Sequence, residues 1–339
     1  MNKRLGKCTI LLANPVSVST YYCAGGKREK EGPLGGLIDY TTDDDTFGED
    51  TWEKAESSLQ KRIFEGLMSK AGKQPSDVEY LLAGDLLNQC IGSHYGLRDF
   101  GVPFFGLFGA CSTMAEGLAL GSILIDGGFA GRVAALTSSH FCSAERQFRL
   151  PLEYGGQRPP TSQWTVTGGA AVLLESCGAG PYVTHITVGR IVDMGIKDVN
   201  NMGAAMAPAA ADTLISFFRD TGTYPTDYDI IVTGDLGFVG WELAKTLLGK
   251  EGWLMGDNYN DCGLMIYDRD KQSVDAGGSG CGCSAVVLAS RLLPGLQSGL
   301  YRNVLFVGTG ALMSPTSVQQ GESIPAIAHL VRLSTVKEG

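Results

Sequence analysis

A twelve-residue segment occurs twice in the chain, 150 positions apart, and this repeat constrains the fold more than any other feature. Residues 75–86 read PSDVEYLLAGDL, and residues 225–236 read PTDYDIIVTGDL. Each copy contains an apolar run that predicts a strand, and each follows a predicted helix, the first of which is amphipathic over 52–71. Duplication explains such a pair better than chance does.

The order of elements around the two copies repeats as well. In each half, a turn rich in Gly and Cys leads into an apolar helix, and a second strand follows. These segments are, half by half, 109–111, 113–125 and 131–137, then 280–283, 285–293 and 301–307. We therefore divide the chain into an N-terminal half, 1–176, and a C-terminal half, 177–339.

Helices that alternate with apolar strands predict an α/β fold. We expect two mostly parallel sheets, covered by helices and connected by right-handed crossovers. A pseudo-two-fold relation between the halves would place the turn at Cys111 opposite the turn at 280–283. Ligands in such folds gather beyond strand ends, where helix N-termini point, so one central cleft shared by both halves is the predicted site.

Cys111 lies where an apolar run turns into a helix, within the segment FGACSTMAEG over 108–117. The unpaired N–H groups and the positive dipole end of a helix N-terminus favour a thiolate, and they equally favour a bound carboxylate. The position is therefore compatible with nucleophilic catalysis, with anion binding, or with a small buried cysteine.

The net charge limits the classes of partner, and the cysteine content indicates the compartment. The formal net charge is −9, and no basic face is evident, so a nucleic acid partner is excluded. Nine cysteines without framework spacing indicate a reducing compartment. We find neither a signal peptide nor an apolar run of ~18 residues, and we expect cytoplasmic synthesis with at most peripheral membrane association.

Motifs for metals and nucleotides are missing. The acidic run at 43–45 lacks the spaced ligands of a calcium loop, and Cys281 and Cys283 lack a second pair at zinc spacing. The glycine-rich turn over 277–283 matches neither nucleotide-binding pattern. We expect no cofactor and no metal site built by the chain.

The duplicated halves, with a cysteine at the first helix turn and a glycine-rich turn at the matching place in the second half, resemble the thiolase and ketoacyl synthase superfamily. Three segments, 109–114, 137–149 and 156–168, more specifically resemble the stage V sporulation protein AD (SpoVAD) family of spore-forming bacteria. The resemblance covers essentially the whole chain. It implies an α/β, thiolase-like fold with duplicated halves in a five-layered α-β-α-β-α arrangement.

The same resemblance implies a function. It implies a protein that binds dipicolinic acid (pyridine-2,6-dicarboxylic acid), either alone or as its calcium chelate. It implies support for uptake of this ligand into the developing spore with SpoVA membrane proteins, in a peripheral position on the spore inner membrane. It leaves open whether the chain forms a homodimer, as superfamily members usually do.

The residues that match the superfamily's catalytic positions argue against catalysis. Acyl transfer needs donors to a developing oxyanion, supplied by His and Asn in ketoacyl synthases and by His and a second Cys in thiolases. Here the matching places hold Asp235, the turn GGSG at 277–280, and a turn at 308–311 without cysteine. We expect a binding protein rather than an enzyme. The alternatives are a ketoacyl synthase-like acyltransferase with Cys111 as nucleophile, and a scaffold with a vestigial cleft that docks on membrane partners.

A planar dianion calls for helix N-terminal N–H groups and guanidinium groups. The predicted ligand site comprises Asp85, Asn88, Cys111, Ser138, His140, Arg146 and Arg149. Asn88 also fits a helix cap, His140 fits a structural histidine equally well, and each arginine taken alone fits a surface ion pair better. We expect at least one arginine, Arg158 included, to reach the cleft. Asp85 beside an anion would have to be protonated, orient an arginine, or join a bridging cation.

Overall fold

The computed structural model describes residues 3–148 and 157–337. Most of its strands form one large mixed sheet in the order β11-β10-β13-β14-β9-β2-β8-β6-β4-β5, and β7 (Trp164–Thr165) and β12 (Gly278–Ser279) form a separate pair. The bounds are β2 Thr9–Gly25, β4 Tyr80–Gly84, β5 Phe104–Gly106, β6 Arg132–Ser139, β8 Gly168–Glu175, β9 Tyr182–Thr187, β10 Ile230–Thr233, β11 Tyr259–Asp261, β13 Asn303–Ala311 and β14 Ala326–Ser334. The short strands β1 (Arg4–Leu5) and β3 (Tyr40–Thr41) pair with β2.

From the middle of the sheet toward each of its two edges, equivalent strands of the two halves follow one another in the same order. In the first half β4 lies parallel to β5 and β6, while β8 lies antiparallel to β6 and β2. The second half repeats this pattern with β10, β11, β13, β14 and β9. The expectation of mostly parallel sheets is therefore wrong, because the last strand of each half returns antiparallel beside its predecessor and needs no crossover. Antiparallel pairing of β2 with β9 joins the halves.

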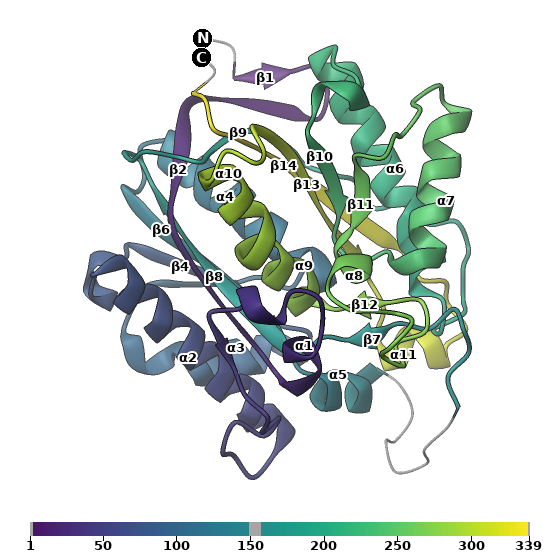
Figure 1. Ribbon diagram of the computed structural model, residues 1–339, viewed down its shortest axis with the longest axis horizontal. Coiled ribbons are helices and arrows are strands. Elements are labelled where there is room, and N and C mark those ends of the chain that lie inside the picture. The colour runs from purple at the N-terminus through teal and green to yellow at the C-terminus, as the bar shows by residue number, and fades with distance from the viewer. Residues whose placement is uncertain (1–2, 149–156, 338–339) are drawn as a thin grey trace.

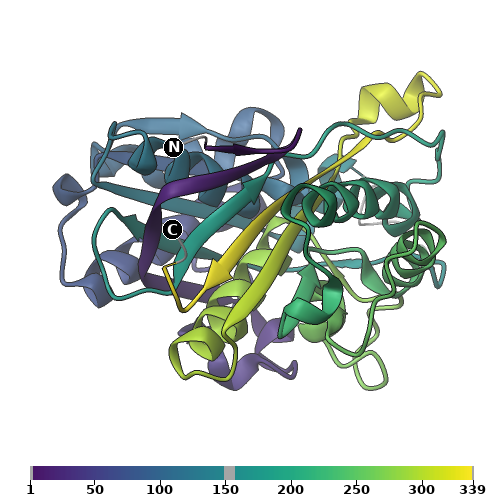
Figure 2. The ribbon, with the colours of Figure 1, turned by 90° about the horizontal axis from the view of Figure 1, so that it is seen from above.

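Helices fill the space between the two halves of the sheet and cover their outer faces. The bounds are α1 Lys27–Lys30, α2 Trp52–Ala71, α3 Ile91–Leu97, α4 Thr113–Asp126, α5 Phe141–Phe148, α6 Met202–Thr221, α7 Gly237–Lys250, α8 Cys262–Met265, α9 Cys281–Val287, α10 Leu293–Gln297 and α11 Pro315–Gln319. Helices α2 and α3 lie outside the first half, α6 and α7 lie outside the second, and α4 and α9 lie between them (Figures 1 and 2). The predicted five-layered arrangement is confirmed.

The repeat extends into the helices that precede the duplicated strands. Helix α2 starts after Thr51, whose hydroxyl accepts a hydrogen bond from the Lys54 N–H, and it ends at Gly72 with φ +62°. Helix α6 starts after Asn201, whose side chain accepts from Ala204, and it ends at Gly222 with φ +67°. Both helices are thus capped in the same way, 150 positions apart.

The boundary that the sequence predicts between the halves, at 176/177, falls between β8 and β9. It stays a prediction, because the joined sheet leaves no separate unit to mark it. Within residues 3–148 and 157–337, none of the helices combines the length and apolar character that a membrane span requires.

Candidate functional site

A pocket of about 360 Å³ lies beside Cys111, and side chains from both halves line it. Its walls are mainly apolar. The lining residues are Leu86, Phe108, Ala110, Cys111, Ala144, Glu145, Phe148, Thr165, Met202, Ser279, Ala311, Leu312, Met313, Ser314 and Ser317. A cleft shared by the two halves, as expected from the duplication, is therefore present at Cys111.

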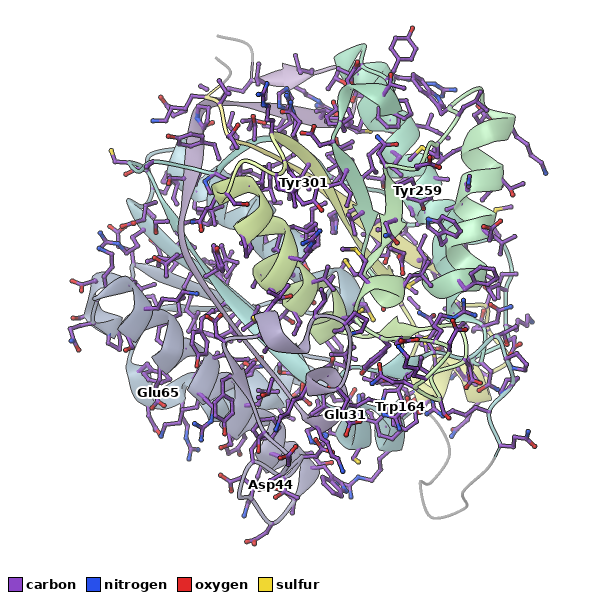
Figure 3. The ribbon with its side chains drawn as sticks, in the orientation of Figure 1. Glu31, Asp44, Glu65, Trp164, Tyr259 and Tyr301 are labelled. Carbon is purple, nitrogen blue, oxygen red and sulfur yellow. The ribbon has the colours of Figure 1, made fainter. Side chains whose placement is uncertain are left out.

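A short parallel pair of strands carries residues of both halves to the pocket. Strand β7 (Trp164–Thr165) pairs with β12 (Gly278–Ser279), and this pairing sets Thr165 beside Ser279. Gly280 follows with φ +101°, a conformation that favours glycine, and helix α9 begins at the next residue. Trp164 can be located in Figure 3, near the lower edge of the molecule.

Cys111 occupies a tight turn, Ala110–Ser112, directly before α4. Ala110 has φ +50°, which costs a residue other than glycine roughly 1–2 kcal/mol. Cys111 is 7% exposed, and its thiol lies within electrostatic reach of the carboxylate of Asp235. Burial raises the pKa of this thiol well above its usual range, and the negative charge of Asp235 raises it further. These two effects outweigh the helix dipole, so the expected preference for thiolate is reversed.

Asp235 follows β10 and is fully buried against the turn before α9. Its carboxylate accepts hydrogen bonds from the Ser279 hydroxyl (3.0 Å), the Gly280 N–H (2.9 Å) and the Thr309 hydroxyl (2.8 Å). Burial raises the pKa of this carboxyl group, while its hydrogen bonds oppose the shift. Asp235 is thus an acceptor in all three of these hydrogen bonds, where acyl-transfer chemistry needs a donor.

Glu145 is the charged side chain that lines the pocket in the part of the chain that the structure describes, and sequence analysis missed it. It is 4% exposed. One oxygen accepts from the Thr165 hydroxyl (2.9 Å), and the other forms an ion pair with Arg158 (2.6 Å). Arg158 also lies over the ring of Phe141. One feature of the sequence could have indicated Glu145: it directly precedes Arg146, which sequence analysis had assigned to the site.

Asp85 and Ser138 lie behind the pocket, in a buried polar network. The Asp85 carboxylate accepts from the N–H of Leu87 (2.9 Å) and from both the N–H (2.7 Å) and the hydroxyl (2.6 Å) of Ser93. Ser138 donates to the buried carboxylate of Glu56 (3.1 Å). Neither residue is among those that line the pocket. The hydrogen bonds of Asp85 and Ser138 therefore connect parts of the fold and leave neither side chain at the pocket.

His140 and Asn88 also contact protein groups rather than the pocket. The Nε2 atom of His140 lies 2.6 Å from the Asp45 carbonyl oxygen, and Nδ1 accepts from the Cys142 N–H. Burial lowers the pKa of this imidazole, so His140 is a neutral structural histidine. Asn88 accepts from the Gln147 side-chain amide at 3.1 Å.

The three arginines considered for the site, Arg146, Arg149 and Arg158, differ in what the structure shows of them. Arg146 pairs with Glu53 at the surface, as the simpler interpretation of a single arginine predicts. Arg158 comes closest to the expected contact, because it pairs with a carboxylate that lines the pocket. Arg149 lies outside the described residues. Among the predicted site residues that the structure describes, Cys111 lines the pocket and the others do not. The described residues also contain no cluster of three or more His, Cys, Asp or Glu side chains suited to a metal ion.

The sequence and the fold both have relatives. A profile of the family "Stage V sporulation protein AD (SpoVAD)" matches residues 6–334. Stage V sporulation protein AD of Bacillus subtilis (strain 168) is 47% identical over 327 residues, which cover 96% of each chain.

Solved structures of enzymes share the fold at low identity. A single-residue variant of OleA from Xanthomonas campestris aligns with a TM-score of 0.59 and 12% identity, over 96% of this chain and 99% of that one. The 3-oxoacyl-[acyl-carrier-protein] synthase III of Aquifex aeolicus VF5 aligns at 0.55 and 11%, over 94% and 99%. Human mitochondrial 3-ketoacyl-CoA thiolase aligns at 0.54 and 11%, over 96% and 99%. The fold is thiolase-like, and the chain belongs to the stage V sporulation protein AD (SpoVAD) family.

Proposed function

We propose that this protein acts in spore formation as a non-catalytic binding protein for dipicolinic acid, which it holds in the pocket beside Cys111. In this proposal it supports uptake of the ligand into the developing spore together with SpoVA membrane proteins, at the surface of the spore inner membrane. Membership in a sporulation family supports the setting. The observation that carries the non-catalytic part is the burial of the Cys111 thiol near the buried carboxylate of Asp235, because burial and the negative charge of Asp235 both raise the pKa of this thiol.

These surroundings of the thiol oppose both requirements of acyl transfer. A nucleophilic cysteine must reach the thiolate state, yet burial and then the charge of Asp235 raise the pKa of the Cys111 thiol. An oxyanion needs donors, and each missing donor costs roughly 3–4 kcal/mol of transition-state stabilisation. The alternative of an acyltransferase that uses Cys111 has one observation in its favour: the cysteine lies at the end of a largely apolar pocket before a helix N-terminus.

The pocket lining suits a flat aromatic ligand with polar edges. Phe108, Phe148 and Leu86 offer apolar contact for a ring. The hydroxyl oxygens of Ser279 and Thr165, whose protons are donated to Asp235 and Glu145, add polar contact as acceptors. The ion pair of Glu145 with Arg158 has no net charge, so the charged group that lines the pocket offers a dianion no excess positive charge. The one-to-one calcium chelate of dipicolinate carries no net charge, so we propose the chelate as the preferred form.

Calorimetric titration with dipicolinate, in the presence and absence of Ca²⁺, tests the proposal. We expect saturable binding that is tighter with Ca²⁺. Phe108→Ala should weaken it about 3- to 10-fold through loss of the aromatic contact. Phe105→Ala is the matched control, because Phe105 is similarly exposed (49% against 53%) but does not line the pocket. Absence of binding under both conditions would refute the proposal.

A thioester assay separates the binding protein from the enzyme. Acetyl-CoA incubated with the wild type and with Cys111→Ala should release coenzyme A at the same background rate. Faster release by the wild type, lost in Cys111→Ala and kept in Cys281→Ala, would establish the acyltransferase instead. Sedimentation velocity of the same samples tests the homodimer, which stays a prediction.

A further inference from the structure

The connection between β13 and β14, residues 312–325, forms one wall of the pocket beside Cys111. Ala311 and Ala326 pair at the ends of these antiparallel strands, where a turn of roughly two to five residues would suffice. The chain instead makes a longer excursion that carries α11. Its residues that line the pocket are Leu312, Met313, Ser314 and Ser317. The added length therefore builds part of the site.

The equivalent connection of the first half forms another wall of the same pocket. Ser139 and Gly168 pair at the ends of β6 and β8, and the chain between them carries α5. Its residues that line the pocket are Ala144, Glu145, Phe148 and Thr165. The duplication thus supplies two corresponding walls, one from each half.

The two walls differ in how firmly they are packed. Ser143, Ala144 and Glu145 of α5 are buried, and the Ser143 hydroxyl donates to the buried carboxylate of Glu56 (2.7 Å). None of the residues of α11, all of which the structure describes, is buried. Figure 2 shows α11 projecting from the upper edge of the molecule. Movement of α11 therefore breaks few packing contacts, whereas movement of α5 would expose a buried carboxylate.

The base of the connection between β13 and β14 is fixed. The Leu312 N–H donates to the Pro325 carbonyl oxygen (2.7 Å), which continues the pairing of the two strands by one step. The Ile324 N–H donates to the Ile196 carbonyl oxygen (2.7 Å), and the Ile324 side chain is buried in the core of the second half. Residues 313–323 therefore extend from a firm base.

Exposed side-chain contacts hold 313–323 against the loop that precedes α6. The Ser323 hydroxyl donates to the Asp193 carboxylate (2.6 Å), and the Lys197 ammonium group donates to the Gly321 carbonyl oxygen (2.6 Å). Asp193, Lys197 and Gly321 are all exposed. Hydrogen bonds in contact with water contribute little net free energy, because water replaces either partner when they break. A firm base with a lightly held end is the construction of a lid.

We propose that residues 313–323 form a lid, which moves about its fixed base to open and close the pocket beside Cys111. The proposal takes this pocket as the ligand site, and in that respect it rests on the proposed function. When the lid is closed, Met313, Ser314 and Ser317 complete the lining. When it is open, the pocket loses this wall and admits a ligand from solvent. The contacts of Asp193 and Lys197 with the lid set how often it opens.

Alkylation of Cys111 by iodoacetamide, followed by peptide mass spectrometry, measures lid opening without a ligand, because Cys111 lines the pocket and is 7% exposed. Asp193→Ala should raise the alkylation rate about 2- to 10-fold, the effect of one lost hydrogen bond. Asp198→Ala is the matched control and should react like the wild type. Both aspartates are exposed and accept from the N–H two residues on, of Gly195 (2.8 Å) and Asn200 (2.9 Å) respectively. An unchanged rate in Asp193→Ala, or equal acceleration in both variants, would overturn the proposal.

Hydrogen exchange of the full chain locates the movement. Asp193→Ala should speed exchange of the α11 amides by the same factor as alkylation of Cys111, and it should leave the α5 amides unchanged. Faster alkylation without faster α11 exchange would show that the reagent reaches the thiol by another route, and would overturn the lid.

The ligand provides the last comparison. Saturating dipicolinate should slow exchange of the α11 amides, because a lid closed over its ligand opens less often. Bound dipicolinate that leaves α11 exchange unchanged would overturn closure over the ligand. The alkylation and exchange measurements on the free protein need no dipicolinate, so a failure of dipicolinate to bind would refute the proposed function while those measurements still decide whether the lid opens.

Discussion

Asp85 and Asp235 occupy equivalent positions of the repeat, at the ends of β4 and β10, yet they lie in different surroundings. Asp85 is enclosed with Glu56 in a polar network behind the pocket, and it accepts its hydrogen bonds from Leu87 and Ser93. Asp235 lies against Cys111 and the α9 turn. The duplication supplied the same carboxylate twice, and the neighbours decide whether it belongs to a site.

The helices that precede the two strands account for much of this difference. Helix α2 places Glu56 and Gln60 in the first-half network, where Gln60 donates to Ser93 (3.0 Å) and Ser138 (2.9 Å). The equivalent residues of α6, 150 positions later, are the buried Met206 and Ala210. The first half therefore carries a polar network that the second half does not repeat at these positions.

Loss of either carboxylate should produce the largest effect. Asp85→Ala and Asp235→Ala each leave three or more buried donors without an acceptor, so we expect each to lower the free energy of unfolding by about 3–5 kcal/mol. Urea unfolding measures this. If Asp235→Ala alone lowers the free energy of unfolding by less than about 1 kcal/mol, water from the pocket replaces the lost carboxylate. Only Asp85 would then be required for the stability of the fold.

The buried pair of the first half should make stability depend on pH. Burial raises the pKa of Glu56 well above its usual range, and the charge of Asp85 adds to this shift. A raised carboxyl pKa contributes stability that is complete below the unfolded-state pKa of about 4.3 and is lost as pH rises through the folded-state pKa. The free energy of unfolding should therefore fall from pH 5 to pH 8.

Glu56→Gln should reduce this pH dependence, because the amide keeps the shape of the protonated acid. A remainder should persist, because burial also raises the pKa values of Glu29 and Asp261 to about 7. Glu65→Gln is the matched control on the same helix, since Glu65 is exposed and points outward from α2 (Figure 3). Equal slopes of stability against pH for the wild type and Glu56→Gln would show that Glu56 is ionised in the folded protein and that the network, rather than a shared proton, stabilises the pair.

The sequence alone predicted the scaffold, because each copy of the repeat can be recognised within a short segment of the chain. The constant spacing of 150 placed both strands, and the apolar periodicity over 52–71 predicted α2 at the bounds that the structure shows. Strand direction was not predictable in this way, because an apolar run such as 131–137 fits either orientation. The mixed sheet follows from tertiary pairing of β6 with β8, which no short segment encodes.

The site was predictable only where the turn itself carries the signal. Cys111 and Asp235 stand out in their motifs, and in the structure the charge of Asp235 contributes to the raised pKa of the Cys111 thiol. Glu145 and the burial of Asp85 depend on partners distant in sequence, Arg158 in one case and the network around Glu56 in the other. His140 illustrates the same limit, because its partner, the Asp45 carbonyl, lies 95 positions earlier.

Asp235→Asn tests whether this carboxylate controls the Cys111 thiol. Removal of its charge should lower the thiol pKa and speed alkylation of Cys111 by iodoacetamide at pH 8, roughly tenfold for each unit by which the pKa falls. Peptide mass spectrometry follows Cys111 separately from the other cysteines. Asp85→Asn should leave the rate unchanged. Equal acceleration in both variants would instead indicate a general loosening of the fold.

The two cysteines before the central helices give the smallest expected difference. Cys281 is fully buried, and its thiol donates to the Ala110 carbonyl oxygen (3.0 Å), whereas Cys111 faces the pocket. Cys281→Ala should leave a closed cavity and cost about 1 kcal/mol of unfolding free energy, while the space left by Cys111→Ala opens to solvent and costs less. Thermal unfolding should show a drop of about 2 °C for Cys281→Ala and a smaller one for Cys111→Ala. The reverse order would mean that the Cys111 thiol stabilises the fold more than the buried Cys281 thiol does, instead of merely lining a site.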